Sequence, residues 1–357
     1  MFESPDGMIW LLDQHWDWKI AVYLFFGGLA GGAYLTGVVA ELLGLRSEGP
    51  DRKTAMQRMG QWGMITAVAA IAVGGIILFT HLGAPLRALL FPVLFVNFGS
   101  WLVIGTWVIV LFAVVAAIQA FWLIWGPENA GGFSSFPAKI TAWIEDRSGV
   151  PLDTWVRKLA SWTHPGTSIR LGVHALGSVL AVGLIVYTAL LLSDVAWLVP
   201  VWDRSLLPFL FLASGLSIGL AATAGLTAFF EGLEGTSITG FSLLDDVVIL
   251  GEIAVLALLV RSLTGGDPAA IASYETITGE FALLFWGGIV VLGLVGPLVL
   301  SAAILLLEWR TDVHASDRLE RIVRGVYTAK FGFVVLGGLF LRYLILFTAV
   351  KAPLAPA

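Results

Sequence analysis

The sequence contains no cysteine among its 357 residues. Without thiolate ligands, the protein cannot hold an iron–sulfur cluster of its own or a thiolate metal site, and it cannot form a disulfide. One-electron chemistry in this protein would therefore depend on a partner or on a bound small molecule.

Charged residues are also scarce. They make up 13% of the chain, whereas 58% of the residues are apolar and the mean hydropathy is +0.90. Soluble domains contain about 25% charged residues, so this composition excludes an ordinary soluble globule. The net charge of -5 argues against a nucleic-acid partner, because nucleic acid requires a basic face.

The apolar residues are gathered in long runs. Runs of about 20 residues with few charges are typical of helices that cross a bilayer, and such helices pair their backbone polar groups internally. We therefore expect an all-α integral membrane protein, a single polytopic domain whose eight transmembrane helices form two four-helix bundles. The expected spans are residues 18–43, 62–80, 98–125, 171–193, 205–230, 244–262, 281–307 and 328–350.

Lysine and arginine are unevenly distributed between the two faces. Of the 20 basic residues, 14 lie in or beside the connections that follow spans 1, 3, 5 and 7. The positive-inside rule places these connections in the cytoplasm, so both termini are expected outside it, in a prokaryotic plasma membrane. The longest cytoplasmic connection, residues 126–170, contains Trp143 and Trp155 in short amphipathic pieces, and we expect it on the inner membrane surface.

Histidine could supply ligands for haem, but the spacing is unfavourable. A bis-histidine haem requires two ligands on facing helices at the same depth. His81 falls at the outer end of span 2 and His174 near the inner end of span 4, and the other three histidines lie in or beside connections. We therefore expect no haem in this protein.

Ionisable residues within the spans are costly in a membrane and are candidates for function. Arg342 lies about 18 Å along the last helix from Lys330, toward the outer face; it either extends to the headgroups or points inward. Glu252 lies near the middle of span 6, with Asp245 and Asp246 closer to the cytoplasm. These three carboxyl groups are candidates for a proton path from the inner side.

Glycines in the first span are spaced for close helix packing. Gly27 and Gly31, and also Gly28 and Gly32, lie four residues apart, a spacing that lets two helices approach closely.

Four segments resemble the NrfD/PsrC family, the integral membrane subunit of polysulfide-reductase-type complexes. They are WDWKIAVYLFFGGLAGGAYL in the first span, THLGAPLR after the second, NFGSWLVIGTW at the start of the third and GGLFLRYLIL in the last. Their order makes the set more specific than any one segment, and the resemblance extends over most of the sequence.

The resemblance implies a quinone-binding membrane anchor in a respiratory oxidoreductase complex, with menaquinone or ubiquinone as the ligand. It also implies a partner on the outer face that carries several iron–sulfur clusters and docks a molybdopterin enzyme or a multihaem cytochrome. Electrons would pass between the clusters and a quinol bound near that face. Membrane lipid would surround the spans of the protein.

Candidate quinone-binding residues come from the matching segments and from helix counting. They share an outer depth and are Lys19, Tyr23, His81, Arg87, Asn97, Ser100 and Arg342. Nearby aromatic side chains, Phe25, Trp101 and Tyr343, would form apolar walls for the ring and tail. The set predicts a site that holds the two carbonyl oxygens of a quinone and exchanges protons with it.

Two other functions are compatible with the sequence. A secondary transporter would use a midplane site at broken helices; Pro297 and Glu252 fit such a site, although no internal repeat is visible. A purely structural anchor would hold soluble subunits at the membrane without binding quinone.

Overall fold

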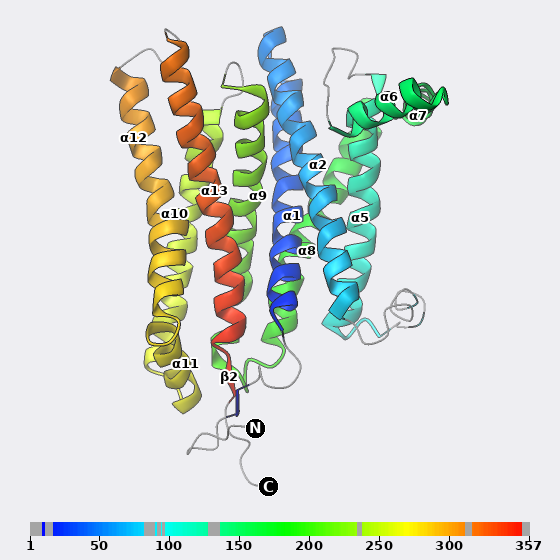
Figure 1. Ribbon diagram of the computed structural model, residues 1–357. Helices are drawn as coiled ribbons and strands as arrows, with labels where there is room; N and C mark the ends of the chain where they lie inside the picture. Colours follow the sequence, from blue (N-terminus) through cyan, green and yellow to red (C-terminus); the bar gives the residue numbers. More distant parts are fainter. Residues whose placement is uncertain are drawn as a thin grey trace.

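The structure, a computed structural model, describes residues 9–10, 17–81, 90, 94, 97–127, 136–233, 238–310 and 316–351. Its long helices are α1 (Trp18–Leu45), α2 (Pro50–His81), α5 (Trp101–Trp125), α8 (Thr167–Ser193), α9 (Leu207–Glu231), α10 (Ile238–Thr264), α12 (Gly296–Arg310) and α13 (Asp317–Phe347) (Figure 1). The shorter elements are α6 (Phe136–Ser148), α7 (Leu152–Thr163), the 3-10 helix η3 (Pro200–Trp202), α11 (Pro268–Thr278), the π-helix η4 (Leu283–Val295), and the strands β1 (Ile9–Trp10) and β2 (Val350–Lys351).

Seven helical segments of the described residues are long and apolar enough to cross a membrane. They are α1, α2, α5, α8, α9, the joined η4 and α12, and α13. α10, the counterpart of the expected span 244–262, is 27 residues long and lies among them in Figure 1. The prediction of an all-helical integral membrane protein is therefore confirmed, with seven candidate spans.

Two helices extend well beyond their apolar runs. α2 begins at Pro50, before the expected span 62–80, and α13 begins at Asp317, before the expected span 328–350. Both added segments are rich in charged and polar residues. Hydropathy marks only the part of a helix that suits lipid, whereas the backbone hydrogen bonds continue the helix into water.

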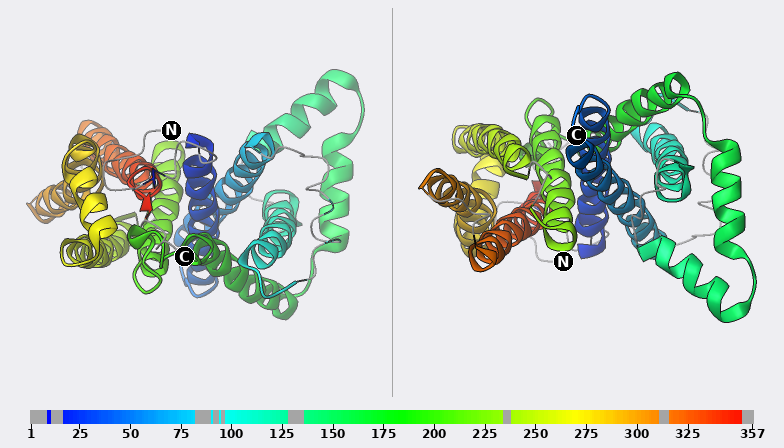
Figure 2. Two further views of the ribbon diagram at one scale, coloured as in Figure 1. Left: turned by 90° about the horizontal axis from the view of Figure 1, so that it is seen from below. Right: turned by 90° about the horizontal axis from the view of Figure 1, so that it is seen from above.

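α1 lies between two groups of helices, as Figure 2 shows. It packs against α2 and α8 on one side and against α9 and α13 on the other. α5 packs against α2 and α8, α10 packs against α9, and η4 and α12 pack against α13. α1 is consequently the most buried of the candidate spans, with 72% of its most apolar stretch buried.

Glycines let α1 approach its neighbours closely. A Cβ atom on Gly32 would overlap the carbonyl oxygen of Gly215 in α9, and Gly28 also faces Gly215. Gly31 faces α8 instead, whereas Gly27 faces open space. The predicted close packing is confirmed for three of these four α1 glycines.

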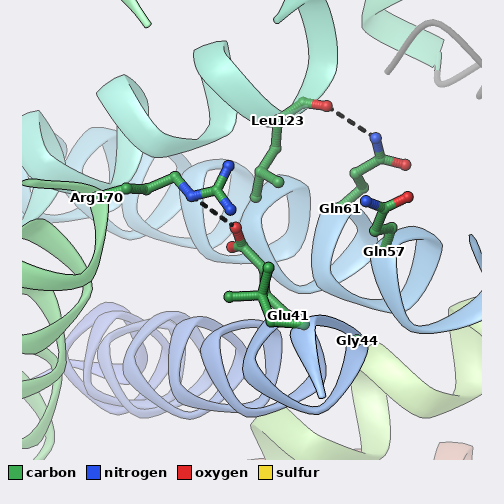
Figure 3. Close-up of a pocket in the computed structure, with 7 residues that line it drawn as sticks. Glu41, Gly44, Gln57, Gln61, Leu123 and Arg170 are labelled. Carbon is green, nitrogen blue, oxygen red and sulfur yellow. Dashed lines mark hydrogen bonds and ion pairs between the residues drawn. The ribbon is translucent and has the colours of Figure 1, made fainter. Parts of the chain in front are cut away.

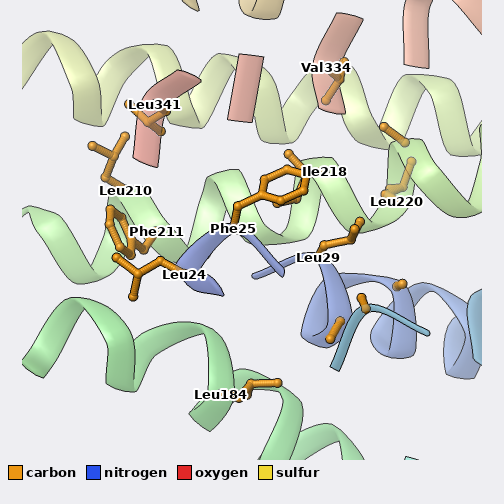
Figure 4. Packing of buried hydrophobic residues seen from close by; sticks show 14 of the residues in the cluster. Leu24, Phe25, Leu29, Leu184, Leu210, Phe211, Ile218, Leu220, Val334 and Leu341 are labelled. Carbon is orange, nitrogen blue, oxygen red and sulfur yellow. The ribbon is translucent and has the colours of Figure 1, made fainter. Parts of the chain in front are cut away.

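The apolar core follows the junction of α1, α9 and α13 (Figure 4). Its buried members are large aliphatic and aromatic side chains, among them Leu24, Phe25, Leu29, Leu184, Leu210, Phe211, Ile218, Leu220, Val334 and Leu341. Lipid tails are as apolar as these side chains, so close van der Waals packing rather than removal from water holds such helices together.

The helix that fills the expected span 281–307 has two windings. η4 is π-helical, and the backbone N–H of Gly296 donates to the carbonyl oxygen of Val291, five residues back. Pro297 follows in the first turn of α12. Proline has no N–H to donate, so the change of winding lies next to the residue that interrupts the hydrogen-bond pattern.

Short elements lie at both ends of the long helices. α6 and α7 occupy the connection 126–170 and lie across the direction of the long helices (Figure 1). At the other end, η3 and α11 both contact β2; neither was expected from the sequence. β1 and β2 pair antiparallel there, Ile9 opposite Lys351 and Trp10 opposite Val350, where α1 begins and α13 ends.

Candidate functional site

The first candidate residues lie at the start of α1. Asp17 precedes the helix, and its Oδ1 accepts a hydrogen bond of 2.9 Å from the backbone N–H of Lys19. The Lys19 ammonium lies 3.5 Å from the other carboxylate oxygen of Asp17. Asp17 therefore both caps the helix and holds Lys19, whose side chain remains partly exposed.

Tyr23 lies about one turn further along α1 and is half-buried. Its phenol interacts electrostatically with that of Tyr187, a buried residue of α8. The ring of Tyr187 lies against Gly105 of α5, where any side chain would overlap it. Neither hydroxyl has a hydrogen-bond partner among the described residues, so both can donate to an oxygen atom of a ligand.

The other candidates at this end are described only in part. His81 ends α2, but its side chain, like all of Arg87, lies outside the described residues. Asn97 is exposed, and its Oδ1 accepts a hydrogen bond of 3.1 Å from the backbone N–H of Gly99. Ser100 occupies the N-cap position of α5 and is partly buried, without a capping bond from its side chain.

Arg342 is turned into the protein rather than toward the outer headgroups, because it is only 1% exposed. Its guanidinium donates to the hydroxyl of Ser214 and, at 3.2 Å, to the carbonyl oxygen of Phe211. It lies 4.7 Å from the centre of the Phe211 ring, within cation–π range. Nη2 faces Gly28 of α1, where the missing side chain leaves room for it.

Arg342 and Tyr23 lie on different sides of α1. Positions 23 and 28 are five residues apart, which corresponds to a rotation of about 140° around the helix. Gly28 faces α9 and Arg342, whereas Tyr23 faces Tyr187 of α8. Tyr23 therefore lies on the side of α1 that faces α8, and Arg342 lies on the side that faces α9.

Arg342 instead joins the carboxyl groups of α10. Glu252 is 5% exposed, and its carboxyl group interacts with the hydroxyl of Ser214 and with the guanidinium of Arg342. Ser214, which is fully buried, thus links the two charged residues. A bridged pair of this kind is one way in which ionisable groups are accommodated inside a membrane protein.

Asp245 repeats this arrangement about two turns away on α10. It is fully buried, and its Oδ1 accepts a hydrogen bond of 2.7 Å from Ser217. Oδ2 has no hydrogen-bond partner in the described part of the chain. Ser214 and Ser217 lie one turn apart on α9, and each faces a carboxyl group of α10.

Asp246 is paired with Lys330, which has no exposed surface. The Lys330 ammonium lies 2.7 Å from Oδ1 of Asp246 and donates to the hydroxyl and carbonyl oxygens of Ser242, at 2.5 and 3.1 Å. Ser301 of α12 donates to the other oxygen of Asp246. The sequence places Lys330 at the cytoplasmic edge of the last span but does not predict its ion pair with Asp246.

Polar groups continue from Lys330 toward the end of the bundle near α6 and α7. The Tyr327 hydroxyl, about one turn before Lys330, lies 3.0 Å from Oγ1 of Thr239 and 3.2 Å from Oε1 of Glu308. The described side chains form a series along α10, which we call the α10 series: Glu308, Thr239, Tyr327, Lys330, Asp246, Asp245, Glu252 and Arg342.

A separate polar cluster lies in the other group of helices (Figure 3). Glu41 of α1 is 3% exposed, and its two oxygens lie 3.4 Å from Nε of Arg170 and 3.1 Å from Nε2 of His174, both on α8. The adjoining cavity has about 20 Å³ of space for water, enough for one molecule. Glu41 is thus buried and paired with two side chains of α8.

Metal ligands do not gather in the described part of the chain. No three His, Asp or Glu side chains there are placed to hold a metal ion together.

Comparison with known proteins gives a family for these features. Residues 12–353 match the family model described as polysulphide reductase, NrfD. The sequence is 30% identical to one of the chains of polysulfide reductase from Wolinella succinogenes, over 81% of this chain and 83% of that protein. It is 28% identical to protein NrfD of Escherichia coli over 93% of this chain and 94% of that protein.

These matches confirm the family resemblance seen in the sequence. Together with the candidate spans, they also confirm the prediction that the protein crosses a prokaryotic plasma membrane several times. The chain belongs to the polysulphide reductase NrfD family.

Proposed function

We propose that this protein is the quinone-binding membrane subunit of a respiratory oxidoreductase complex and passes electrons between the quinone pool and an iron–sulfur partner. The observation that carries the proposal is the family match over nearly the whole of a sequence that contains no cysteine. Its Wolinella relative is named as one chain of polysulfide reductase, and therefore as one part of a complex. Metal redox centres would then belong to the other subunits.

The proposed topology has eight spans in two groups of four, with both termini outside the cytoplasm. α10 would be the eighth span, because it is as long as its neighbours and packs against α9. The basic connections, including α6 and α7, would face the cytoplasm. The end that carries β1 and β2 would then face outward, where an iron–sulfur subunit with a molybdopterin enzyme or a multihaem cytochrome would dock.

The proposed quinone site lies near the outer end of α1. Conversion between quinone and quinol moves two electrons and two protons, so the site requires hydrogen-bond partners for two oxygens and a route for protons. Tyr23 and Tyr187 support it, because their hydroxyls are free of partners in the described structure. The proposed set at this end is Lys19, Tyr23, His81, Arg87, Asn97 and Ser100, with Arg342 approaching from the other side of α1, and the proposed ligand is menaquinone or ubiquinone.

The α10 series is the proposed proton path. Asp245, Asp246 and Glu252 lie on one helix with serines or charged partners beside each, and hydroxyl and carboxyl groups can pass protons between them. The series ends at Arg342, which touches α1 at Gly28. We therefore propose that Arg342 connects this path to the quinone region across α1.

Quinone binding is tested with the purified protein. We expect quinone to copurify and to be displaced by a quinone-site inhibitor. Tyr23→Phe should weaken binding about fivefold, the effect of losing one hydrogen bond, whereas the half-buried Tyr274→Phe on α11 should leave it unchanged. Absence of bound quinone would favour a structural anchor, and solute uptake by liposomes that contain the protein would favour a transporter.

The proton path is tested with Glu252→Gln in the whole complex, reconstituted in liposomes with a pH dye on the side of the basic connections and run in the direction of quinone reduction, which consumes protons. We expect proton uptake from that side to fall about tenfold or more, because the amide cannot exchange the proton. The exposed Glu275→Gln on α11 is the control. Unchanged electron transfer together with unchanged uptake would remove the basis for the path.

A further inference from the structure

α7 presents an apolar stripe that is not covered by any described part of the protein. Trp155, Leu159 and Trp162 recur at intervals of four and three residues and therefore share one face of the helix. Their exposed fractions are 58%, 50% and 84%. α6 adds Trp143, which is 59% exposed and lies 5.7 Å below the guanidinium of Arg147. A soluble surface rarely exposes apolar side chains in such a continuous patch.

The opposite face of α7 is fixed to α5. Ala160 is fully buried, and the indole N–H of Trp122 donates to the hydroxyl of Thr163 at 3.2 Å. Trp125 likewise donates to Thr141 of α6 at 3.2 Å. Trp122 and Trp125 both belong to the last turn of α5, so the pair of helices α6 and α7 is held at the level where this candidate span ends.

The two short helices also hold each other in a defined arrangement. Glu145 of α6 accepts hydrogen bonds of 2.9 Å from the backbone N–H and the hydroxyl of Thr154 in α7. Asp153 accepts a bond of 2.6 Å from Thr141. Burial opposes ionisation of Asp153, but these bonds and the charge of Arg157 outweigh it and keep its pKa below the ordinary value of 3.8. The stripe is therefore displayed by a rigid pair of helices.

We propose that α6 and α7 form a membrane-interface platform, in which Trp155, Leu159 and Trp162 insert at the boundary between phospholipid headgroups and acyl chains. Three observations favour lipid over a protein partner. The platform is level with the end of α5, α5 itself exposes apolar side chains such as Val114 and Ile118 in the turns before that end, and tryptophan prefers this boundary. Lys158, exposed beside the stripe, reaches the phosphate groups.

The platform also borders the Glu41 cluster. His164, the residue that ends α7, lines a cavity together with Glu41, Arg170 and His174. Docking of α7 on lipid thereby fixes one wall of that polar cavity. This surface is independent of the proposed quinone chemistry, and its test does not require the quinone site to be correct.

The absence of cysteine allows a direct test by spin labelling of the full-length protein in phospholipid nanodiscs. Single labels are placed at Leu159→Cys and Trp162→Cys on the stripe and at Ser161→Cys, an exposed neighbour off the stripe. We expect collisions with oxygen, relative to those with a water-soluble nickel chelate, to be about fivefold more frequent at 159 and 162 than at 161, as for an interfacial helix.

Two outcomes would overturn the proposal. Equal access of the nickel chelate to all three labels would show that the stripe faces water. Low access of both reagents at 159 and 162 would show that protein covers it, either a second copy or a partner. Because each stripe position is labelled separately, failure of one variant to fold leaves the other to decide.

Discussion

Asp246 and Lys330 form an ion pair in the interior of the helical bundle. Each charge would be costly alone in an apolar environment, and removal of one partner of a buried pair usually destabilises a protein by about 3–5 kcal/mol. Here Ser242 and Ser301 supply additional hydrogen bonds to the pair. The two charges are therefore compensated as a unit, and their effects on stability should be coupled.

We predict that Lys330→Met lowers the free energy of unfolding by about 3 kcal/mol, because Asp246 is left without its counter-charge. Reversible unfolding in mixed detergent micelles measures the change. The double variant Lys330→Met with Asp246→Leu removes both charges and should recover much of the loss. Independent, additive effects of the two substitutions would show that the pair contributes no coupling.

The sequence identifies the charged residues of the interior better than the side chains that contact them. Asp245, Asp246, Glu252 and Arg342 stand out because a charge in an apolar run is rare. Ser214, Ser217 and Tyr187 do not, because serine and tyrosine are common in such helices. Their roles depend on how α9 and α8 are rotated against α10 and α1, which no single apolar run specifies. Tyr23 and Arg342, which helix counting places at a similar depth, face different helices for the same reason.

Among the elements, the contact of α1 with α9 leaves no room for added volume at Gly32. The backbone of Gly215 occupies the place of a side chain at Gly32, and backbone atoms cannot move aside as a flexible side chain does. Gly27 lies on the same helix and faces open space. The two positions therefore form a matched pair in which only the packing differs.

We predict that Gly32→Ala lowers stability by about 3 kcal/mol or more, because the new methyl group forces the helices apart. Gly27→Ala should be neutral or raise stability by up to about 1 kcal/mol, since alanine favours the helix. Thermal unfolding of both variants in the same detergent measures the difference. Equal changes in stability for Gly32→Ala and Gly27→Ala would contradict the close approach of α1 to α9 at Gly32.

Apolar runs predict the existence of the long elements well and their ends less well. α2 and α13 begin earlier than their apolar parts because charged residues also form helix, and α11 and η3 lie in a connection with no long run. The change to π winding before Pro297 was likewise not predicted. Such features depend on local hydrogen bonding, which hydropathy does not report.

For the whole molecule, the proposed orientation in the membrane predicts which connections face the cytoplasm and which face outward. Glu48, between α1 and α2, would face the cytoplasm, and Ser205, before α9, would face outward; both are exposed. In intact cells, a membrane-impermeant maleimide should label Ser205→Cys and spare Glu48→Cys. Permeabilised cells should allow labelling of both. Labelling of Glu48→Cys alone in intact cells would reverse the proposed orientation.

The sequence predicts membrane insertion and family, but not which helix lies at the centre. The central place of α1 follows from its small residues only once α8 and α9 are known to meet them. The Glu41 cluster shows the same limit, since Arg170 and His174 are far from Glu41 in the sequence and meet it only after α8 packs.

This central place has a consequence for how the protein is made. α1 leaves the ribosome before α9 and α13, whose segments begin at residues 207 and 317. α1 must therefore wait in the bilayer, with its glycine-lined surface against lipid, until both of these helices have been translated. Arg342 can reach Gly28 only after α13 has been inserted, so a protein truncated before α13 would leave that meeting point unformed.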